Sequence, residues 1–97
     1  MIRFQRTMKV RRGKQSTMWA KEILDYTNAV HGKTFQLFRS RFGNLSTIYW
    51  MADFEDLATL EAWQQKVGAD PGYRVLIKKA FDIIIPGTVE DTILESL

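Results

Sequence analysis

The stretch TIYWMADFEDL, residues 47–57, decides the fold because it predicts a strand with two apolar faces that runs directly into a helix. Alternate residues of a strand point to opposite faces of the sheet. One face of this strand is apolar throughout: Ile48, Trp50, Ala52 and Phe54. The other face carries Tyr49 and Met51, which are also large and apolar. A sheet that is solvated on one side does not carry such residues on both faces, so we expect each face to be covered.

Three further segments read as strands because they are apolar or alternating and end at turns: residues 2–10, 34–42 and 83–85. Gly43 and Asn44 predict a tight turn that joins two of the strands into a hairpin, because both residues tolerate positive φ. Arg6 is the one charged residue on the apolar side of the first strand. Pro86 is expected to end the strand at residues 83–85.

Apolar residues recur at steps of three or four in the remaining segments, which predicts helices there: residues 14–31, residues 57–67 and a segment that begins at Pro71. Asp56 and Asp70 are predicted to cap the second and third helices. Ser16 or Thr17 is predicted to cap the first helix, and Gly32 to end it in a left-handed conformation.

The predicted elements follow the order β-α-β-β-α-(α)-β, which indicates a ferredoxin-like α+β fold. Such a fold has a four-stranded antiparallel sheet with helices on one face, and its first and last strands are neighbours. Residues 1–97 are expected to form one domain of this kind. Residues 88–97 fit either a helical step or a buried strand, and both alternatives stay open.

Charge is distributed unevenly along the chain, whose net charge is +3. Residues 1–21 contain bases and no acid, whereas residues 82–97 contain acids and no base. A basic segment can bind nucleic acid, but alternation with apolar residues favours a strand whose charges are partly neutralised by the acidic segment. An RNA-binding module stays a distant alternative, because residues 46–51 lack the basic and glycine positions of the RNA-recognition motif.

Composition excludes several kinds of site. The absence of cysteine excludes disulfides, thiolate zinc sites and cysteine nucleophiles, and a single histidine excludes a metal centre built from imidazoles. No apolar run approaches the ~20 residues of a membrane span. Arg3 and Arg6 interrupt any signal-peptide core, so a cytoplasmic protein is expected.

Four segments carry a family resemblance: Tyr49–Leu57, Leu60–Trp63, Asp70–Arg74, and Ile85–Val89 with Thr92–Leu94. In residue type and order the chain resembles the dimeric α/β-barrel superfamily, and within it the NIPSNAP family. The resemblance implies a homodimer that packs sheet against sheet and encloses a cavity between sheet and helices. The apolar residues on both strand faces independently predict a second copy of the chain, related by a two-fold axis.

The expected function is the binding of a small organic ligand, anionic or aromatic, in that cavity. The resemblance also implies an alternative, a cofactor-free monooxygenase or polyketide-cyclase-type enzyme, so whether the protein has an activity stays open. No cofactor is expected. A haem-degrading relative would place a histidine on the second helical segment, and this sequence has none there.

The candidate ligand-binding residues are cationic or aromatic: Arg39, Arg41, Tyr49, Trp50, Trp19 and Trp63. An arginine inside a strand needs an acceptor, which is either a ligand or a protein carboxylate such as Asp53. The aromatic side chains, together with Tyr26 and Tyr73, line a pocket or fill the core and the dimer interface.

His31 and Tyr49 are the candidates for catalysis. His31 falls in the last turn of a predicted helix, where the helix dipole alone favours a histidine. A carboxylate cluster at Asp53, Glu55 and Asp56 could ligate a hard cation, but acids are common at a helix start, so no metal site is predicted.

Overall fold

The computed structural model describes residues 1–43 and 46–97. Its strands and helices are β1 (Ile2–Lys9), α1 (Lys14–His31), β2 (Gln36–Arg39), β3 (Thr47–Phe54), α2 (Leu57–Gly68), α3 (Pro71–Lys78), the 3-10 helix η1 (Lys79–Asp82) and β4 (Glu90–Glu95). This order confirms the predicted ferredoxin-like α+β fold. Of the predicted turn, Gly43 has a φ of 83°, and Asn44 lies outside the described residues.

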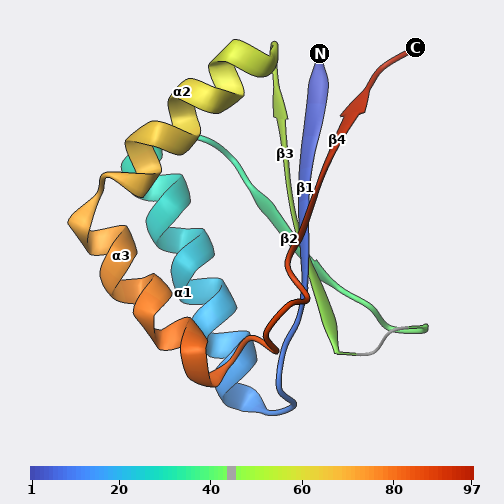
Figure 1. Ribbon diagram of the computed structural model, residues 1–97, viewed down its shortest axis with the longest axis vertical. Coiled ribbons are helices and arrows are strands. Elements are labelled where there is room, and N and C mark those ends of the chain that lie inside the picture. Colours follow the sequence, from blue (N-terminus) through green and yellow to red (C-terminus); the bar gives the residue numbers. More distant parts are fainter. Residues whose placement is uncertain (44–45) are drawn as a thin grey trace.

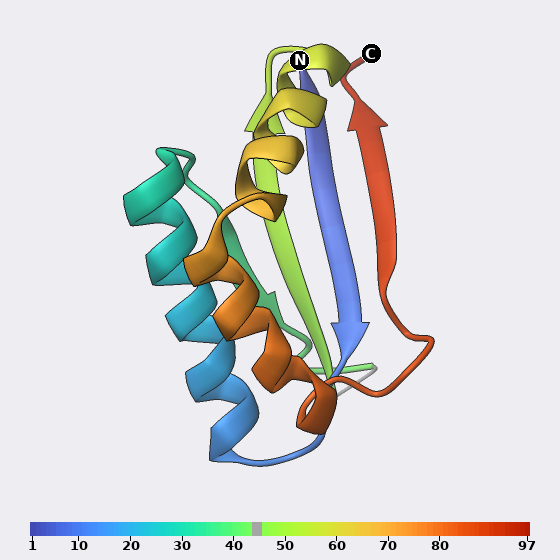
Figure 2. The same ribbon diagram turned by 60° about the vertical axis from the view of Figure 1, so that its left-hand side comes forward.

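The four strands form one antiparallel sheet in the order β2-β3-β1-β4. Figures 1 and 2 show α1, α2 and α3 together on one face of this sheet. No described helix covers the opposite face, which we call the open face. The N-terminal strand lies between β3 and the C-terminal strand, as the predicted topology requires.

The strand register explains which side chains form the core. Trp50 lies opposite Arg6, and Ala52 lies opposite Phe4, so these residues share the face that the helices cover. Most of the core comes from this face and from the inner sides of the helices: Phe4, Met8, Trp19, Ile23, Trp50, Phe54 and Leu60 are among its buried members. Burial of large apolar side chains is the main term that stabilises a sheet-on-helix layer of this size.

Local sequence signals set most helix ends. The Asp56 carboxylate accepts a hydrogen bond from the Thr59 amide at 2.8 Å, and the Asp70 carboxylate accepts one from the Gly72 amide at 2.9 Å. Gly32 ends α1 with a φ of 66°. The predicted cap of α1 by Ser16 or Thr17 is wrong, because the N-cap residue is Gly13 and no side chain caps the helix.

The fourth strand lies later in the chain than predicted. Residues 83–85 follow η1 directly and form only a single bridge, between Ile84 and Val10, before Pro86 interrupts them. The strand is Glu90–Glu95, which resolves the segment whose conformation was open. It pairs with β1 over six residues, and its Asp91 lies opposite Arg6 and forms an ion pair with it. The predicted second strand, residues 34–42, is shortened to Gln36–Arg39.

No helix within the described part of the chain is long and apolar enough to cross a membrane.

Candidate functional site

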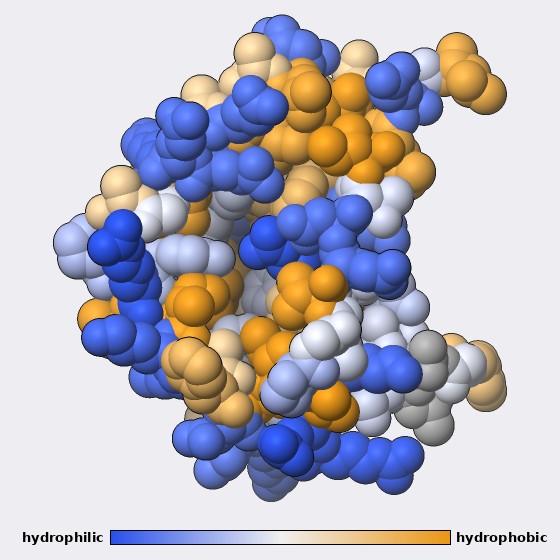
Figure 3. All heavy atoms as spheres, in the orientation of Figure 1, coloured by the Kyte–Doolittle hydropathy of each residue, from blue (hydrophilic) through white to orange (hydrophobic). Residues whose placement is uncertain are grey.

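A cavity of about 400 Å³ lies between the helices and the sheet. Its walls come from β1, β3, all three α-helices and Val89, which precedes β4. Figure 3 shows the molecule hollowed between its helical and sheet sides, with hydrophobic residues beside the hollow. We call this space the helix–sheet cavity. Its volume lies within the range of about 300–1,000 Å³ that is usual for small-molecule sites.

Aromatic side chains form much of the cavity wall. Phe35 stacks on Trp63 with their ring centroids 4.8 Å apart, and Phe4 meets Phe35 edge to face. Trp19 and Trp50 also pack edge to face, at 6.2 Å. Aromatic rings in these geometries form rigid flat surfaces against which another ring can pack. The cavity therefore suits an aromatic or polycyclic ligand by shape.

Three residues of the cavity wall hold buried hydrogen-bonding atoms without a partner in the part of the chain described: Thr27 Oγ1, Trp50 Nε1 and Trp63 Nε1. The third tryptophan differs, because Trp19 Nε1 donates to the Leu76 carbonyl at 3.0 Å. A buried donor without an acceptor costs about 1–3 kcal/mol, so such groups are rare unless something else supplies the partner. An acceptor on a ligand would satisfy them.

Arg6 is the charged residue of the cavity wall. Its Nε and Nη2 donate to the Asp91 carboxylate at 2.7 and 2.8 Å, and the guanidinium lies 5.6 Å from the centroid of Phe4. These hydrogen bonds raise the pKa of Arg6. Because Asp91 supplies a matching negative charge, the pair leaves the wall polar without a net charge. A neutral acceptor fits this wall better than a carboxylate does.

Tyr73 adds a hydroxyl to the same cavity. Burial raises the pKa of Tyr73, while the nearby positive charge of Arg6 opposes that rise. The hydroxyl therefore stays protonated at neutral pH and is able to donate.

The structure separates the predicted ligand-binding residues into three places. Trp19, Trp50 and Trp63 line the helix–sheet cavity. Arg39 lines a different pocket near the start of α1, and Arg41 is exposed outside both. Tyr49 lies on the open face, where its hydroxyl is 3.0 Å from the Ser40 hydroxyl. Of the six candidates, the three tryptophans therefore share the helix–sheet cavity, whereas Arg39, Arg41 and Tyr49 lie elsewhere.

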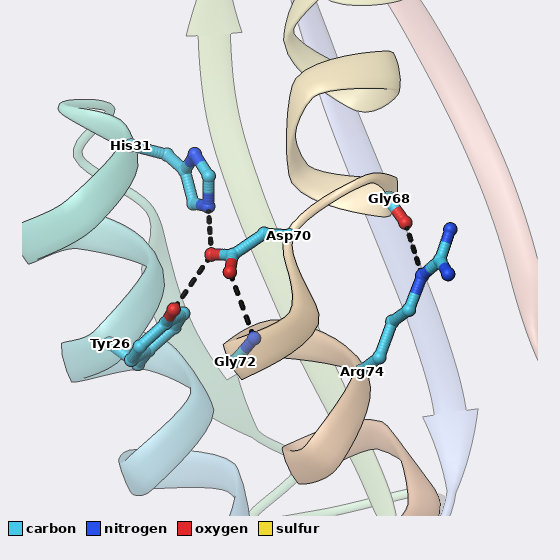
Figure 4. Close-up of polar contacts among 6 residues, drawn as sticks. All are labelled: Tyr26, His31, Gly68, Asp70, Gly72 and Arg74. Carbon is cyan, nitrogen blue, oxygen red and sulfur yellow. Dashed lines mark hydrogen bonds and ion pairs between the residues drawn. The ribbon is translucent and has the colours of Figure 1, made fainter.

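His31 belongs to a cluster that joins the end of α1 to the start of α3 (Figure 4). Its Nε2 lies 2.8 Å from Asp70 Oδ2, which also accepts the Tyr26 hydroxyl at 2.7 Å. Only 4% of the His31 side chain is exposed, and neither His31 nor Tyr26 lines the cavity. The hydrogen bond from Tyr26 is the largest cause of the lowered pKa of Asp70. The cluster thereby links α1 to α3.

The carboxylates near residue 55 also act within the protein. Asp53 accepts two hydrogen bonds from Arg3, at 2.8 and 3.2 Å, which lower the pKa of Asp53, and Asp56 caps α2. Among residues 1–43 and 46–97, no group of three or more potential ligands could hold a metal ion.

Sequence reasoning missed Thr27 and left Arg6 and Tyr73 out of the candidate ligand-binding set. The signal for Arg6 was a charge at an apolar position of an alternating strand. A threonine on an apolar helix face has no such signal, because a helical threonine commonly bonds its own backbone. Only the three-dimensional structure shows that the Thr27 hydroxyl has no partner among the residues described.

The chain was compared with protein-family models, curated proteins and solved structures. The family model described as NIPSNAP matches residues 5–95. No curated protein matches the chain.

Solved structures match over the whole chain. Protein Atu4242 from Agrobacterium tumefaciens is 19% identical with a TM-score of 0.83, covering 100% of this chain and 94% of that one. A NIPSNAP domain protein from Burkholderia xenovorans is 17% identical with a TM-score of 0.78, covering 100% and 95%. A structure titled antibiotic biosynthesis monooxygenase is 10% identical with a TM-score of 0.73, covering 100% and 99%. At these identities the likeness is one of fold.

Proposed function

This chain belongs to the NIPSNAP family, and we propose that it is a homodimer whose helix–sheet cavity binds a small aromatic ligand carrying hydrogen-bond acceptors. The observation that carries the proposal is the set of unpartnered groups in an otherwise apolar cavity: Thr27 Oγ1, Trp50 Nε1 and Trp63 Nε1. A carbonyl or ether oxygen between aromatic rings would meet both the shape and the chemistry of this wall.

Charge narrows the ligand class further. Arg6 is already paired with Asp91 through two hydrogen bonds, and among the described residues no other charged side chain lines the cavity. A carboxylate ligand would have to compete with Asp91 for the same guanidinium. We therefore favour a neutral ligand in this cavity over the anionic one that the sequence also allowed. The cytoplasmic location stays a prediction from the sequence.

Fluorenone and fluorene provide a matched pair of probes, because they share their rings and differ in one carbonyl acceptor. All three tryptophans of the chain line the cavity, so a titration followed by intrinsic fluorescence reports binding there. We expect fluorenone to bind about fivefold to tenfold more tightly than fluorene, the worth of one recovered hydrogen bond.

Thr27→Val removes one unpartnered hydroxyl while it keeps the shape of the side chain, and it should reduce the preference for fluorenone. Thr92→Val, an exposed position on β4, is the matched control and should leave the preference unchanged. Equal affinity for the two probes in the wild-type protein, or no binding of either, would contradict the proposed ligand class.

The homodimer is supported by the open face. Phe38 and Tyr49 lie opposite each other on it, Met51 lies on the same face, and Phe38 is 49% exposed. Apolar and aromatic residues side by side on an uncovered sheet suit isologous packing against a second copy. We expect light scattering at micromolar concentration to give the mass of two chains.

Phe38→Asp places a charge on the open face and should shift that mass to one chain. Phe81→Asp makes the same change at a phenylalanine of η1 that is 84% exposed, and it should leave the dimer intact. A wild-type mass of one chain, or equal effects of the two variants, would rule out this interface.

Enzymatic activity is the second candidate, supported by the fold shared with the antibiotic biosynthesis monooxygenase structure. His31 and Tyr49 do not line the cavity, so the hydroxyl of Tyr73 beside Arg6 is the group best placed to act on a bound substrate. Oxygen uptake with anthrone as substrate, abolished by Tyr73→Phe, is the expected result for this candidate. Uptake equal to that of a protein-free control would exclude turnover of this probe.

A further inference from the structure

A second hollow of about 570 Å³ lies where the connection from β1 to α1 passes the ends of β2 and β3. It shares no lining residue with the helix–sheet cavity. In Figure 1 the connection from β1 to α1 lies at the lower end of the molecule, and Figure 3 shows hydrophilic residues gathered at that end. We call this hollow the basic pocket.

Four cationic side chains line the basic pocket: Arg11, Arg12, Lys14 and Arg39. No acid lines it, and within the part of the chain described none of the four forms an ion pair. Elsewhere the pattern differs, since Arg3 and Arg6 each meet an aspartate. Like charges that converge on one hollow repel one another unless an anion neutralises them.

The start of α1 contributes to the same pocket. Its N-cap residue is Gly13, no side-chain oxygen caps its amides, and its first turn contains no acid. The first amides of a helix point outward without intrahelical partners, and they carry the positive end of the helix dipole. Gly13 adds no bulk here, and a Cβ built on it would meet nothing within 4 Å. The geometry leaves these amides available to an anion.

A buried hydroxyl in the pocket lining provides an independent indication of a ligand. Thr47, at the start of β3, lines the pocket and is only 7% exposed, yet its Oγ1 has no hydrogen-bond partner in the described part of the chain. A buried hydroxyl normally has a hydrogen-bond partner, and no described residue provides one here. An oxygen of a bound anion would provide one.

We propose that the basic pocket binds the phosphate or diphosphate group of a small molecule. Guanidinium groups, helix N-terminal amides and hydroxyls are together the donors that phosphate oxygens prefer. Four cations exceed what one carboxylate would neutralise. An RNA strand fits less well, because the lining contains no aromatic side chain on which a base could stack. The proposal does not depend on the ligand of the helix–sheet cavity.

Isothermal titration with inorganic pyrophosphate at about 0.15 M salt tests the proposal, since surface charges are largely screened there. We expect one site per chain. Arg39→Ala should weaken binding about tenfold, the effect of losing one charge-assisted hydrogen bond. Arg41→Ala removes the same charge two residues away, outside the pocket, and should change the affinity less than about twofold. Equal losses in the two variants, or no heat of binding, would overturn the proposal.

Thr47→Val tests whether the Thr47 hydroxyl contacts the ligand or stabilises the protein. The variant should weaken pyrophosphate binding while leaving the thermal unfolding midpoint unchanged or higher, because the lost hydroxyl has no hydrogen-bond partner among residues 1–43 and 46–97. Unaltered affinity would remove Thr47 from the site and with it the independent support.

Two further arms distinguish the source of the phosphate. Phosphatidylcholine vesicles that contain phosphatidic acid should not retain the protein, and a short single-stranded RNA should be displaced by pyrophosphate if it binds at all. Retention on vesicles in place of pyrophosphate binding would identify a lipid surface and overturn the small-molecule assignment. RNA binding that pyrophosphate does not displace would overturn it in favour of nucleic acid.

Discussion

The helix–sheet cavity and the basic pocket leave opposite kinds of group unsatisfied. In the cavity the charge of Arg6 is matched by Asp91, and the unpartnered atoms are neutral donors. In the basic pocket the cations form no ion pair with a described residue, and Thr47 adds a neutral hydroxyl that has no partner among the described residues. This difference is the reason that we propose two ligands of different chemistry, a neutral aromatic one and a phosphate.

The two hollows also differ in what their walls do for the fold. Phe4, Trp19 and Trp50 line the cavity and belong to the buried core at the same time. Three of the cations of the basic pocket, in contrast, lie on an exposed connection and at the first residue of a helix. Substitutions in the cavity should therefore alter stability and binding together, whereas substitutions of the pocket cations should alter binding alone.

The largest expected difference in stability is between the variants Phe4→Ala and Arg39→Ala. Phe4 is 4% exposed and packs against Phe35, so its truncation opens a void in the core. We expect the free energy of unfolding in urea to fall by about 3–5 kcal/mol. Arg39→Ala should change it by less than about 0.5 kcal/mol, because the side chain is exposed and forms no ion pair with any residue that the structure describes. A large loss in both variants would mean that the basic pocket is also part of the core.

Asp70→Asn tests whether the link between α1 and α3 supports the cavity. Its expected effect on stability is smaller than that of Phe4→Ala. The Asp70 carboxylate receives hydrogen bonds from Tyr26, His31 and the Gly72 amide, and it thereby links α1 to α3 (Figure 4). We expect the thermal midpoint to fall by several degrees. Fluorenone binding should weaken because both helices wall the cavity, while pyrophosphate binding should persist.

The same carboxylate adds a dependence on pH. The hydrogen bond from Tyr26 is the largest cause of the lowered pKa of Asp70 in the folded state, so its stabilisation is present above the unfolded pKa of about 3.9. The contribution is lost as pH falls through the folded pKa. Stability measured from about pH 5 downward should decline less in Asp70→Asn than in the control Asp25→Asn, an exposed position on α1. If both variants lose stability equally as the pH falls, protonation of Asp70 does not contribute to the acid destabilisation of the protein.

Local signals were enough to predict the elements whose ends depend on neighbouring residues. The bounds Thr47–Phe54 and Lys14–His31 were predicted correctly, because alternation defines the strand and Gly32 ends the helix. The caps at Asp56 and Asp70 followed from the same kind of signal. These interactions span a few residues, so the sequence displays them directly.

The fourth strand could not be placed by local signals. Three consecutive isoleucines have higher β-propensity than Glu90–Glu95, yet the later segment forms the strand. Its pairing depends on β1, eighty-five positions away in the case of Arg6 and Asp91. Ile83 is buried in the core instead. Nonlocal pairing of this kind is set by the whole fold and overrides propensity.

The candidate site shows the same limit. An aromatic set that includes Trp19, Trp50 and Trp63 was predicted to line a pocket or fill the core. All three line the cavity, Trp19 and Trp50 also belong to the core, and Trp63 packs against it. The separation of Arg39 from that cavity could not be predicted, because strand parity places Arg39 and Trp50 on the same face. Arg39 lies nearer the end of the sheet than Trp50 does, and this position along the strands, rather than the face, determines which hollow each residue lines.

The variants Thr27→Val and Thr47→Val should give the smallest changes in stability. Each should affect ligand binding in only one of the two hollows. Each variant removes a buried hydroxyl that has no partner in the described part of the chain, so the free energy of unfolding should stay the same or rise by up to about 1 kcal/mol. Valine is tolerated at both positions, since its helix propensity resembles that of threonine and it favours strands. Thr27→Val should weaken only fluorenone binding, and Thr47→Val only pyrophosphate binding. A loss of more than about 1 kcal/mol in either variant would show that its hydroxyl stabilises the protein itself. Crossed effects on the two probes would show that the hollows are coupled, because no residue belongs to both walls.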